Sequence, residues 1–212
     1  MSKRYPGYDV LAKRHGLSWN EQTRRVIDQR LALPREPRFL DGDDWRTLAA
    51  ICDRIVPQPQ TRALVPLAAM VDTKLFDDRR DGYRDYRLPA LREAWRYGLP
   101  IDQEALRRHG VSFHAADATE QDAMLRAAQQ GALDGAAWNG MDCAVFFAKR
   151  LLPDIVTAYY AHPIAWSEIG FGGPASPRGY VRMDFDRRDP WEAAEAQPGR
   201  EGEAARENAR VG

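Results

Sequence analysis

The chain has 212 residues, and its 31 Lys and Arg balance its 31 Asp and Glu, so its formal net charge is zero. This length predicts one domain with tails, and 44% hydrophobic with 29% charged residues is typical of a globular chain. Because nucleic-acid binders usually carry a basic excess, the balanced total argues against a nucleic acid as the partner.

The zero total hides an uneven distribution of charge. Residues 1–40 carry a net charge of +5, residues 41–180 carry −3, and residues 181–212 carry −2. We therefore interpret 1–40 as a basic N-terminal arm with one helix, 41–180 as a helical domain, and 181–212 as a charged, disordered tail. The arm is either a solvated surface or a segment that wraps an acidic partner.

The first predicted helices are marked by their caps and stops. Residues 1–17 have no apolar periodicity and are expected to be extended. Ser18 and Glu21 form a capping box, which predicts a helix to about Leu33. Asp41, Asp43 and Asp44 favour the next helix start, and an amphipathic stripe over 45–55 follows until prolines stop it.

The middle of the chain predicts four shorter helices. Pro66 and Pro89 each stand where a first-turn proline is tolerated. Asp102 is a candidate cap for a helix that ends at Gly110, the usual residue just beyond a helix. Thr119 marks the start of the fourth.

The most apolar predicted element runs over residues 141–160 and covers more than one face, which indicates a central helix. Pro153 should kink or split it, and His162 with Pro163 should end it. Residues 164–180 look like an ordered aromatic loop, and residues 190–212 look disordered. Since no pair of alternating runs is joined by a hairpin turn, the predicted class is all-α. We expect a single irregular helical domain with an extended N-terminal arm and a disordered C-terminal tail.

Cysteine usage and hydropathy bear on the compartment. Cys52 and Cys143 are too few for a disulfide scaffold, so buried thiols are favoured, with one disulfide as the alternative in an exported protein. The longest uncharged stretch, residues 155–167, is shorter than the ~20 residues that a spanning helix needs. No signal peptide can be read, which predicts a cytoplasmic protein, or a periplasmic one if a partner carries the signal.

A search for catalytic patterns predicts no catalytic, cofactor-binding or metal-ligating residue in this chain. Residues 170–173 are glycine-rich but follow a helix, whereas a dinucleotide fingerprint follows a strand. The four histidines lack metal spacing. His162 is expected to satisfy backbone carbonyls at a helix end, with a catalytic base paired with Asp53 or Glu168 as the alternative. Asp53 and Asp72 are read as capping or arginine-paired carboxylates.

Several motifs, in their order and spacing, resemble the gluconate 2-dehydrogenase subunit 3 family over roughly residues 40–180. The matching pieces are Leu48–Pro57, Val71-Asp72, Phe113, Glu120-Gln121, Phe146-Phe147, Ala158–Pro163, Glu168–Pro174 and Pro177–Tyr180. The resemblance departs at the N-terminus, where many members carry a twin-arginine signal that this sequence does not show.

The resemblance implies a non-catalytic accessory, or gamma, subunit of an FAD-dependent sugar, polyol or gluconate dehydrogenase, either soluble or associated with a membrane. It implies that FAD lies in a large subunit of the glucose–methanol–choline type, which this chain would stabilise or chaperone. A cytochrome c subunit is a further candidate partner in the same complex. The aromatic segment and the arm are the expected contact surfaces. The candidate interface residues are Tyr159, Tyr160, His162, Pro163, Trp166, Phe171, Pro174, Arg178 and Tyr180.

Two other functions stay open at this point. One is a small stand-alone enzyme that uses His162 with an acidic partner. The other is an interaction protein unrelated to redox chemistry.

Overall fold

A computed structural model describes residues 4–59, 63–133, 135–176, 179 and 187–211. Within these ranges the chain forms helices and no strand, which confirms the predicted all-α class. The chain divides into two compact units, a terminal unit of residues 1–33 and 160–212 and a central unit of residues 34–159. The expected boundaries, after residues 40 and 180, therefore differ from the observed ones, and the arm and the tail belong to the same unit.

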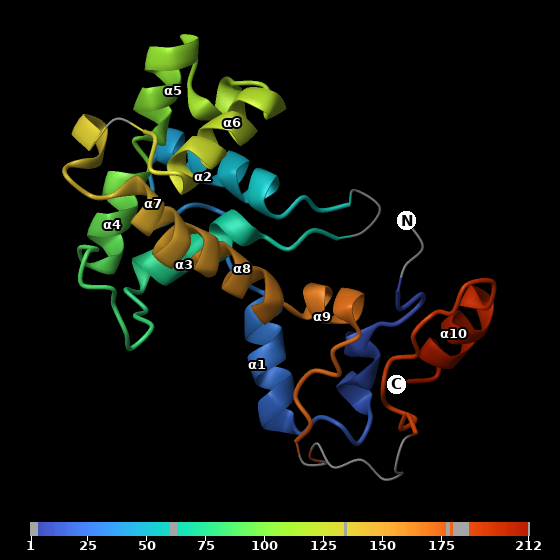
Figure 1. The fold of residues 1–212 in the computed structure, drawn as a ribbon. Helices are drawn as coiled ribbons and strands as arrows, with labels where there is room; N and C mark the ends of the chain where they lie inside the picture. The colour runs from blue at the N-terminus through green and yellow to red at the C-terminus, as the bar shows by residue number, and fades with distance from the viewer. Residues whose placement is uncertain (1–3, 60–62, 134, 177–178, 180–186, 212) are drawn as a thin grey trace. The chain divides into compact units, whose positions relative to one another are not determined.

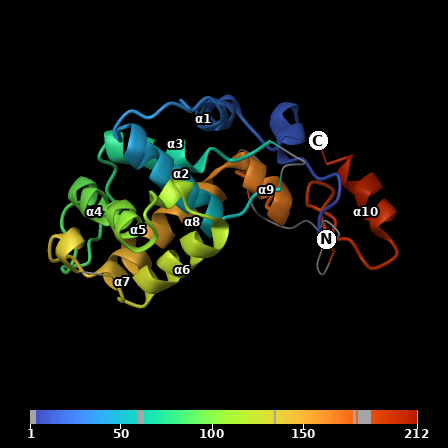
Figure 2. The ribbon, with the colours of Figure 1, turned by 90° about the horizontal axis from the view of Figure 1, so that it is seen from above.

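The central unit is a bundle of short helices. Figures 1 and 2 show α7 and α8 nearly in line, with the other helices of this unit around them. Helix α2 packs on α3 and α6, and α7 packs on α4 and α6. The helices are α2 Gly42–Ile55, α3 Leu67–Phe76, α4 Leu91–Gly98, α5 Ile101–His109, α6 Ala118–Gln129, α7 Cys143–Phe146 and α8 Leu152–Ala161, the last of which crosses the boundary of the unit.

Several helix ends in this unit lie where the sequence predicted them. Asp41 caps α2 by accepting a hydrogen bond from the backbone N–H of Asp44 at 3.2 Å. Gly110 follows α5 in the left-handed region, with φ of +74°. Helix α6 begins slightly earlier than expected. Asp117 is its N-cap and forms a capping box with Glu120, and Thr119 lies inside the helix. Asp102 lies inside the first turn of α5 rather than at its cap.

The predicted break near Pro153 appears as a π-helical turn, Phe147–Leu151, between α7 and α8. The N–H of Leu152 donates to the carbonyl of Phe147, five residues back. Pro153 has no N–H to donate to Lys149, so the regular ladder cannot continue through this turn. The wider turn lets the chain keep its direction without that bond.

The terminal unit joins both ends of the chain. It contains a 3-10 helix η1 Val10–His15, α1 Glu21–Leu31, α9 Pro163–Ile169 and α10 Glu201–Asn208. Its buried core consists of Tyr8, Val10, Trp19, Ile27, Trp166 and Val211. Apolar residues from both ends therefore share one core, although the sequence predicted an extended arm over 1–17.

Helix α1 begins two residues later than the predicted capping box. Asn20 is the cap, and its side chain accepts from the N–H of Thr23 at 2.9 Å. Trp19 pairs with Ser176 in an isolated parallel bridge, and the N–H of Asn20 donates to the Ser176 carbonyl at 2.6 Å. Trp19 and Asn20 are thereby held extended, so the helix begins after Asn20 and Ser18 does not cap it.

The prediction of a disordered tail is wrong for the described residues after 187. Helix α10 buries Ala204 and Asn208, and Ala194 and Val211 are buried beside it. The Asn208 side chain donates to the carbonyls of Pro6 and Ala194, at 2.9 and 3.0 Å. Small side chains and one amide network replace the large apolar residues whose absence suggested disorder.

The two cysteines are buried free thiols, as the sequence favoured. Burial, with the nearby Asp53 carboxylate, raises the pKa of the Cys52 thiol well above its usual range. Among the described helices, none is both long and apolar enough to cross a bilayer.

Candidate functional site

The predicted interface residues fall into a buried and an exposed group. Tyr159, His162, Pro163 and Trp166 are buried, and Pro174 is half-buried. Tyr160 and Phe171 are 50% and 44% exposed. Arg178 and Tyr180 lie outside the described residues. The interface itself stays a prediction, and Tyr160 and Phe171 are the described members that a partner could touch directly.

Trp166 is the anchor of the aromatic segment. Its indole N–H donates to the Tyr160 carbonyl at 2.6 Å, and its ring meets the Phe171 ring edge-on at 5.6 Å. The guanidinium of Arg30 lies 5.5 Å from the Trp166 ring centre and donates to the Ala161 carbonyl at 3.0 Å. These contacts fix the segment that follows α8, so its exposed members are presented on a held backbone.

Gly170 turns the chain at the end of α9, where its φ is +70°. A side-chain Cβ at this position would stand 2.6 Å from the ring of Tyr5. Both the left-handed backbone and the close ring favour glycine here. The glycine-rich stretch 170–173 is thus used for a helix end and close packing.

His162 caps α9 rather than the end of α8. Its Nδ1 accepts a hydrogen bond from the N–H of Ile164 at 3.3 Å, and the residue is 2% exposed. This assigns the ring proton of the neutral imidazole to Nε2. The alternative of a catalytic base with Asp53 or Glu168 stays a prediction. Both carboxylates are exposed, but Asp53 belongs to the central unit whereas His162 belongs to the terminal unit.

The basic charges of the N-terminal arm are largely engaged within the terminal unit. Lys13 is 1% exposed and donates to the Gly172 carbonyl at 3.1 Å. Arg14 pairs with Asp28, and Arg24 donates to the Trp19 carbonyl at 2.7 Å. The excess of positive charge that the sequence showed is therefore built into this unit's own structure.

A charged cluster in the central unit went undetected in the sequence. Asp154 is 4% exposed and accepts from the Trp95 indole N–H at 2.8 Å and from Lys74 Nζ at 2.9 Å. Asp81 accepts from Lys74 at 2.6 Å and from Arg150 at 2.7 Å. We call these five residues the Asp154 network.

Within the Asp154 network, the surroundings of Asp81 favour its ionised form. Burial raises the pKa of Asp81, but hydrogen bonds from Lys74 and Arg150 outweigh it, so this pKa lies below its usual range. The spacing of Arg150 and Asp154 on the helix is a sequence signal for an ion pair. The contacts to Lys74 and Asp81 join distant segments, and no spacing rule predicts them.

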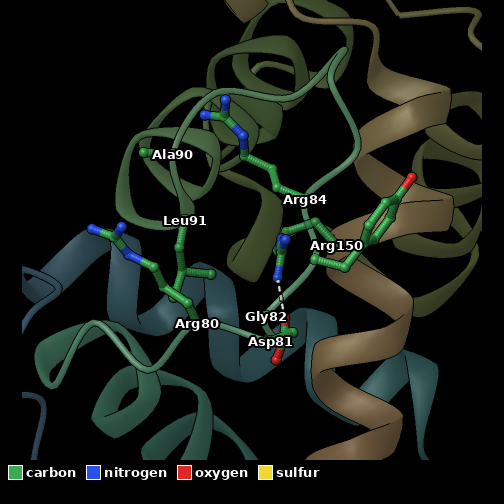
Figure 3. Close-up of a pocket in the computed structure, with 8 residues that line it drawn as sticks. Arg80, Asp81, Gly82, Arg84, Ala90, Leu91 and Arg150 are labelled. Carbon is green, nitrogen blue, oxygen red and sulfur yellow. Dashed lines mark hydrogen bonds and ion pairs between the residues drawn. The ribbon is translucent and has the colours of Figure 1, made fainter.

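An open pocket of about 330 Å³ lies beside the Asp154 network. Its lining residues are Arg80, Asp81, Gly82, Tyr83, Arg84, Ala90, Leu91 and Arg150. Figure 3 shows Arg150 directed at Asp81, while Arg80 and Arg84 extend along the other side of the pocket. The lining carries three guanidinium groups, of which Arg80 and Arg150 are paired with carboxylates, so Arg84 is the one available to an anionic group.

Asp72, one of the two aspartates that the sequence singled out, is engaged by backbone groups. Asp72 is fully buried and accepts from the backbone N–H groups of residues 38–40, at 2.6 to 3.2 Å. It therefore anchors the segment before α2, a role that is neither helix capping nor an arginine pair. The described residues contain no group of three or more His, Cys, Asp or Glu that could hold a metal ion.

The chain was compared with family models, with curated proteins and with solved structures. A family model described as gluconate 2-dehydrogenase subunit 3 matches residues 42–173. That range contains α2 to α9 and both the Asp154 network and the aromatic segment up to Gly173. The comparison with curated proteins gave no match, and neither did the comparison with solved structures.

Proposed function

Because this chain belongs to the gluconate 2-dehydrogenase subunit 3 family, we propose that it is the non-catalytic accessory subunit of an FAD-dependent dehydrogenase. The family name already makes it one subunit of a multi-subunit complex. In this proposal a large flavoprotein subunit of the glucose–methanol–choline type binds FAD and oxidises a sugar, polyol or gluconate hydroxyl. This chain binds that subunit and stabilises its fold, and a cytochrome c subunit is a further candidate in the complex.

The family match carries the proposal, and the chemistry of the charged groups supports it. Asp154, Lys74 and Arg150 are tied to one another, and Asp72 is occupied by backbone N–H groups. Nδ1 of His162 is used in a helix cap. A general acid or base needs a group that can reach a substrate proton. These groups instead act in holding segments together, as a binding subunit requires.

Co-expression tests the proposal. The chain, with an affinity tag, is produced together with a glucose–methanol–choline-type flavoprotein encoded beside it. We expect a yellow complex with the two chains in equal amounts and with dye-linked dehydrogenase activity. We also expect the flavoprotein made alone to show a lower yield and a lower thermal midpoint, because a partner that binds only the folded state stabilises it.

Two results would contradict the proposal. One is a tagged chain that never retains the flavoprotein, and the other is a flavoprotein whose yield and stability do not respond to this chain. The tag alone, expressed with the same flavoprotein, controls for non-specific retention. Fractionation of the same cells into cytoplasm, periplasm and membrane locates the complex.

A further inference from the structure

The loop that joins α3 to α4, residues 77–87, is matched in charge almost residue by residue. It holds four aspartates and four arginines. The ion pairs are Arg79–Asp77, Arg80–Asp78, Arg87–Asp85, Lys74–Asp81 and Arg150–Asp81, all between 2.6 and 2.8 Å. Arg84 is the exception, since it forms no hydrogen bond or ion pair with any residue that the structure describes. One guanidinium of this loop is thus left without a carboxylate.

The same loop is held firmly on both sides of Arg84. Asp81 is fastened to Lys74 and Arg150. Asp85 is 7% exposed and accepts from the side chain and the backbone N–H of Arg87, at 2.7 to 3.0 Å. These bonds hold the pKa of Asp85 well below its usual range. A loop that is already ordered loses less conformational entropy when it binds a partner.

The side chains presented by this held loop are of the type that dominates protein interfaces. Tyr83 and Tyr86 are 77% and 88% exposed, and Arg84 between them is exposed too. Single exposed aromatic residues are ordinary on a protein surface. Tyrosine and arginine, however, are enriched among the residues that carry most of the binding energy. Three of them within four positions of an ordered loop form a compact binding feature.

The adjacent pocket adds charge complementarity. Of its three arginines, Arg80 is paired with Asp78 and Arg150 with Asp81 and Asp154, so the positive charge left over is that of Arg84. Arg150 is 7% exposed, and its buried Nε atom has no hydrogen-bond partner. A buried unpaired donor is costly. Because that atom is buried and Arg150 already faces Asp81, an acidic side chain at this pocket would meet the exposed Arg84.

We infer that residues 82–86 and the pocket beside them bind an acidic segment of the flavoprotein subunit, with a carboxylate on Arg84 and apolar groups against Tyr83 and Tyr86. This inference rests on the proposed function. It assigns the contact to the central unit, whereas the sequence pointed to the aromatic segment and the N-terminal arm. The carboxylate would replace the intramolecular partner that Arg84 lacks.

Charge reversal tests the inference with the full chain and the co-expressed flavoprotein. The Arg84→Glu variant is compared with Arg35→Glu, a matched control in which an exposed arginine of the same unit, also without an ion pair among the described residues, is reversed. Tyr83→Ala is the second test variant. Circular dichroism and thermal midpoints check the fold, and titration of the flavoprotein at low and high salt gives each Kd.

We expect Arg84→Glu to raise the Kd for the flavoprotein by about tenfold or more, and Arg35→Glu to raise it by less than about twofold. The salt dependence of binding should also fall in Arg84→Glu, because one screened charge pair is lost. Equal binding by wild type and Arg84→Glu overturns this inference alone. A wild-type chain that binds no flavoprotein overturns the proposed function instead. Loss of self-association in Arg84→Glu, with flavoprotein binding intact, would show that the loop binds a second copy and would also overturn the inference.

Discussion

Gly98 gives a stability prediction in which two effects oppose each other. It is the last residue of α4, and a helical glycine replaced by alanine usually gains up to about 1 kcal/mol. The Gly98→Ala methyl group, however, would stand 2.2 Å from Cζ and 2.3 Å from Cε1 of Phe146. Because such distances are far inside van der Waals contact, either the Phe146 ring or the helix must move.

The ring of Phe146 has little room to move. It is 1% exposed and meets the rings of Trp95 and Trp138 edge-on, at centroid distances of 5.5 and 5.9 Å. Both tryptophans are themselves buried, at 0% and 1% exposure. Overpacking of a filled core costs about 1–3 kcal/mol. We therefore expect Gly98→Ala to lower the free energy of unfolding by up to about 2 kcal/mol, after the helix gain of up to about 1 kcal/mol is subtracted.

Urea denaturation followed by tryptophan fluorescence measures this change. The matched control is Gly42→Ala in α2, where a Cβ meets only the end of Arg46 at 3.7 Å and should be neutral or slightly stabilising. In the double variant Gly98→Ala/Phe146→Leu, the smaller side chain makes room for the methyl group. The two substitutions should therefore couple favourably by about 1 kcal/mol. A Gly98→Ala protein as stable as Gly42→Ala would refute the packing argument.

Three further predictions concern buried polar groups. Asp72→Ala should cost about 3 kcal/mol or more in urea denaturation, because the N–H groups of residues 38–40 lose a charged acceptor, and an unchanged midpoint would contradict that role. Burial raises the pKa of Glu104, yet two arginines outweigh it and lower this pKa below 4.5. The carboxylate therefore stabilises the fold above pH 4.5 and loses this contribution as the pH falls toward the lower folded pKa, so Glu104→Gln should flatten the acid side of the stability curve. Asn208→Ala removes three hydrogen bonds and should speed proteolysis of the N-terminal arm, whereas a wild-type cleavage rate would show that α10 does not hold it.

Local signals predicted much of the central unit. The acidic start of α2 and the glycine after α5 are short-range features, and the structure places both helix ends there. Pro153 predicted a disturbance of the long apolar helix, and a π-helical turn lies just before it. These predictions needed no knowledge of which segments meet, because capping and proline geometry act within one turn.

The terminal unit was harder to predict because its elements depend on each other. His162 and Pro163 read correctly as the end of α8, but proline is also favoured in the first turn of a helix, and α9 begins there. Helix α10 has no large apolar side chain within its length, and Asn208 joins it to Pro6 at the other end of the chain. No spacing pattern in the sequence predicts such hydrogen bonds between distant segments.

The contacts of the candidate site are also long-range, so the sequence did not predict them. Their arrangement indicates which exposed residues a partner can reach. In the terminal unit, Trp166, His162 and Lys13 are buried and committed to internal contacts, so a partner can reach mainly Tyr160 and Phe171. In the central unit, the ion pairs among residues 77–87 leave Arg84 without a carboxylate partner among the described residues. That loop lies inside the segment 42–173 that the family model matches, whereas the whole of the N-terminal arm and of α10 lies outside it. If binding the flavoprotein is the property that the family has in common, the contact should lie within the matched segment, and the loop meets that condition.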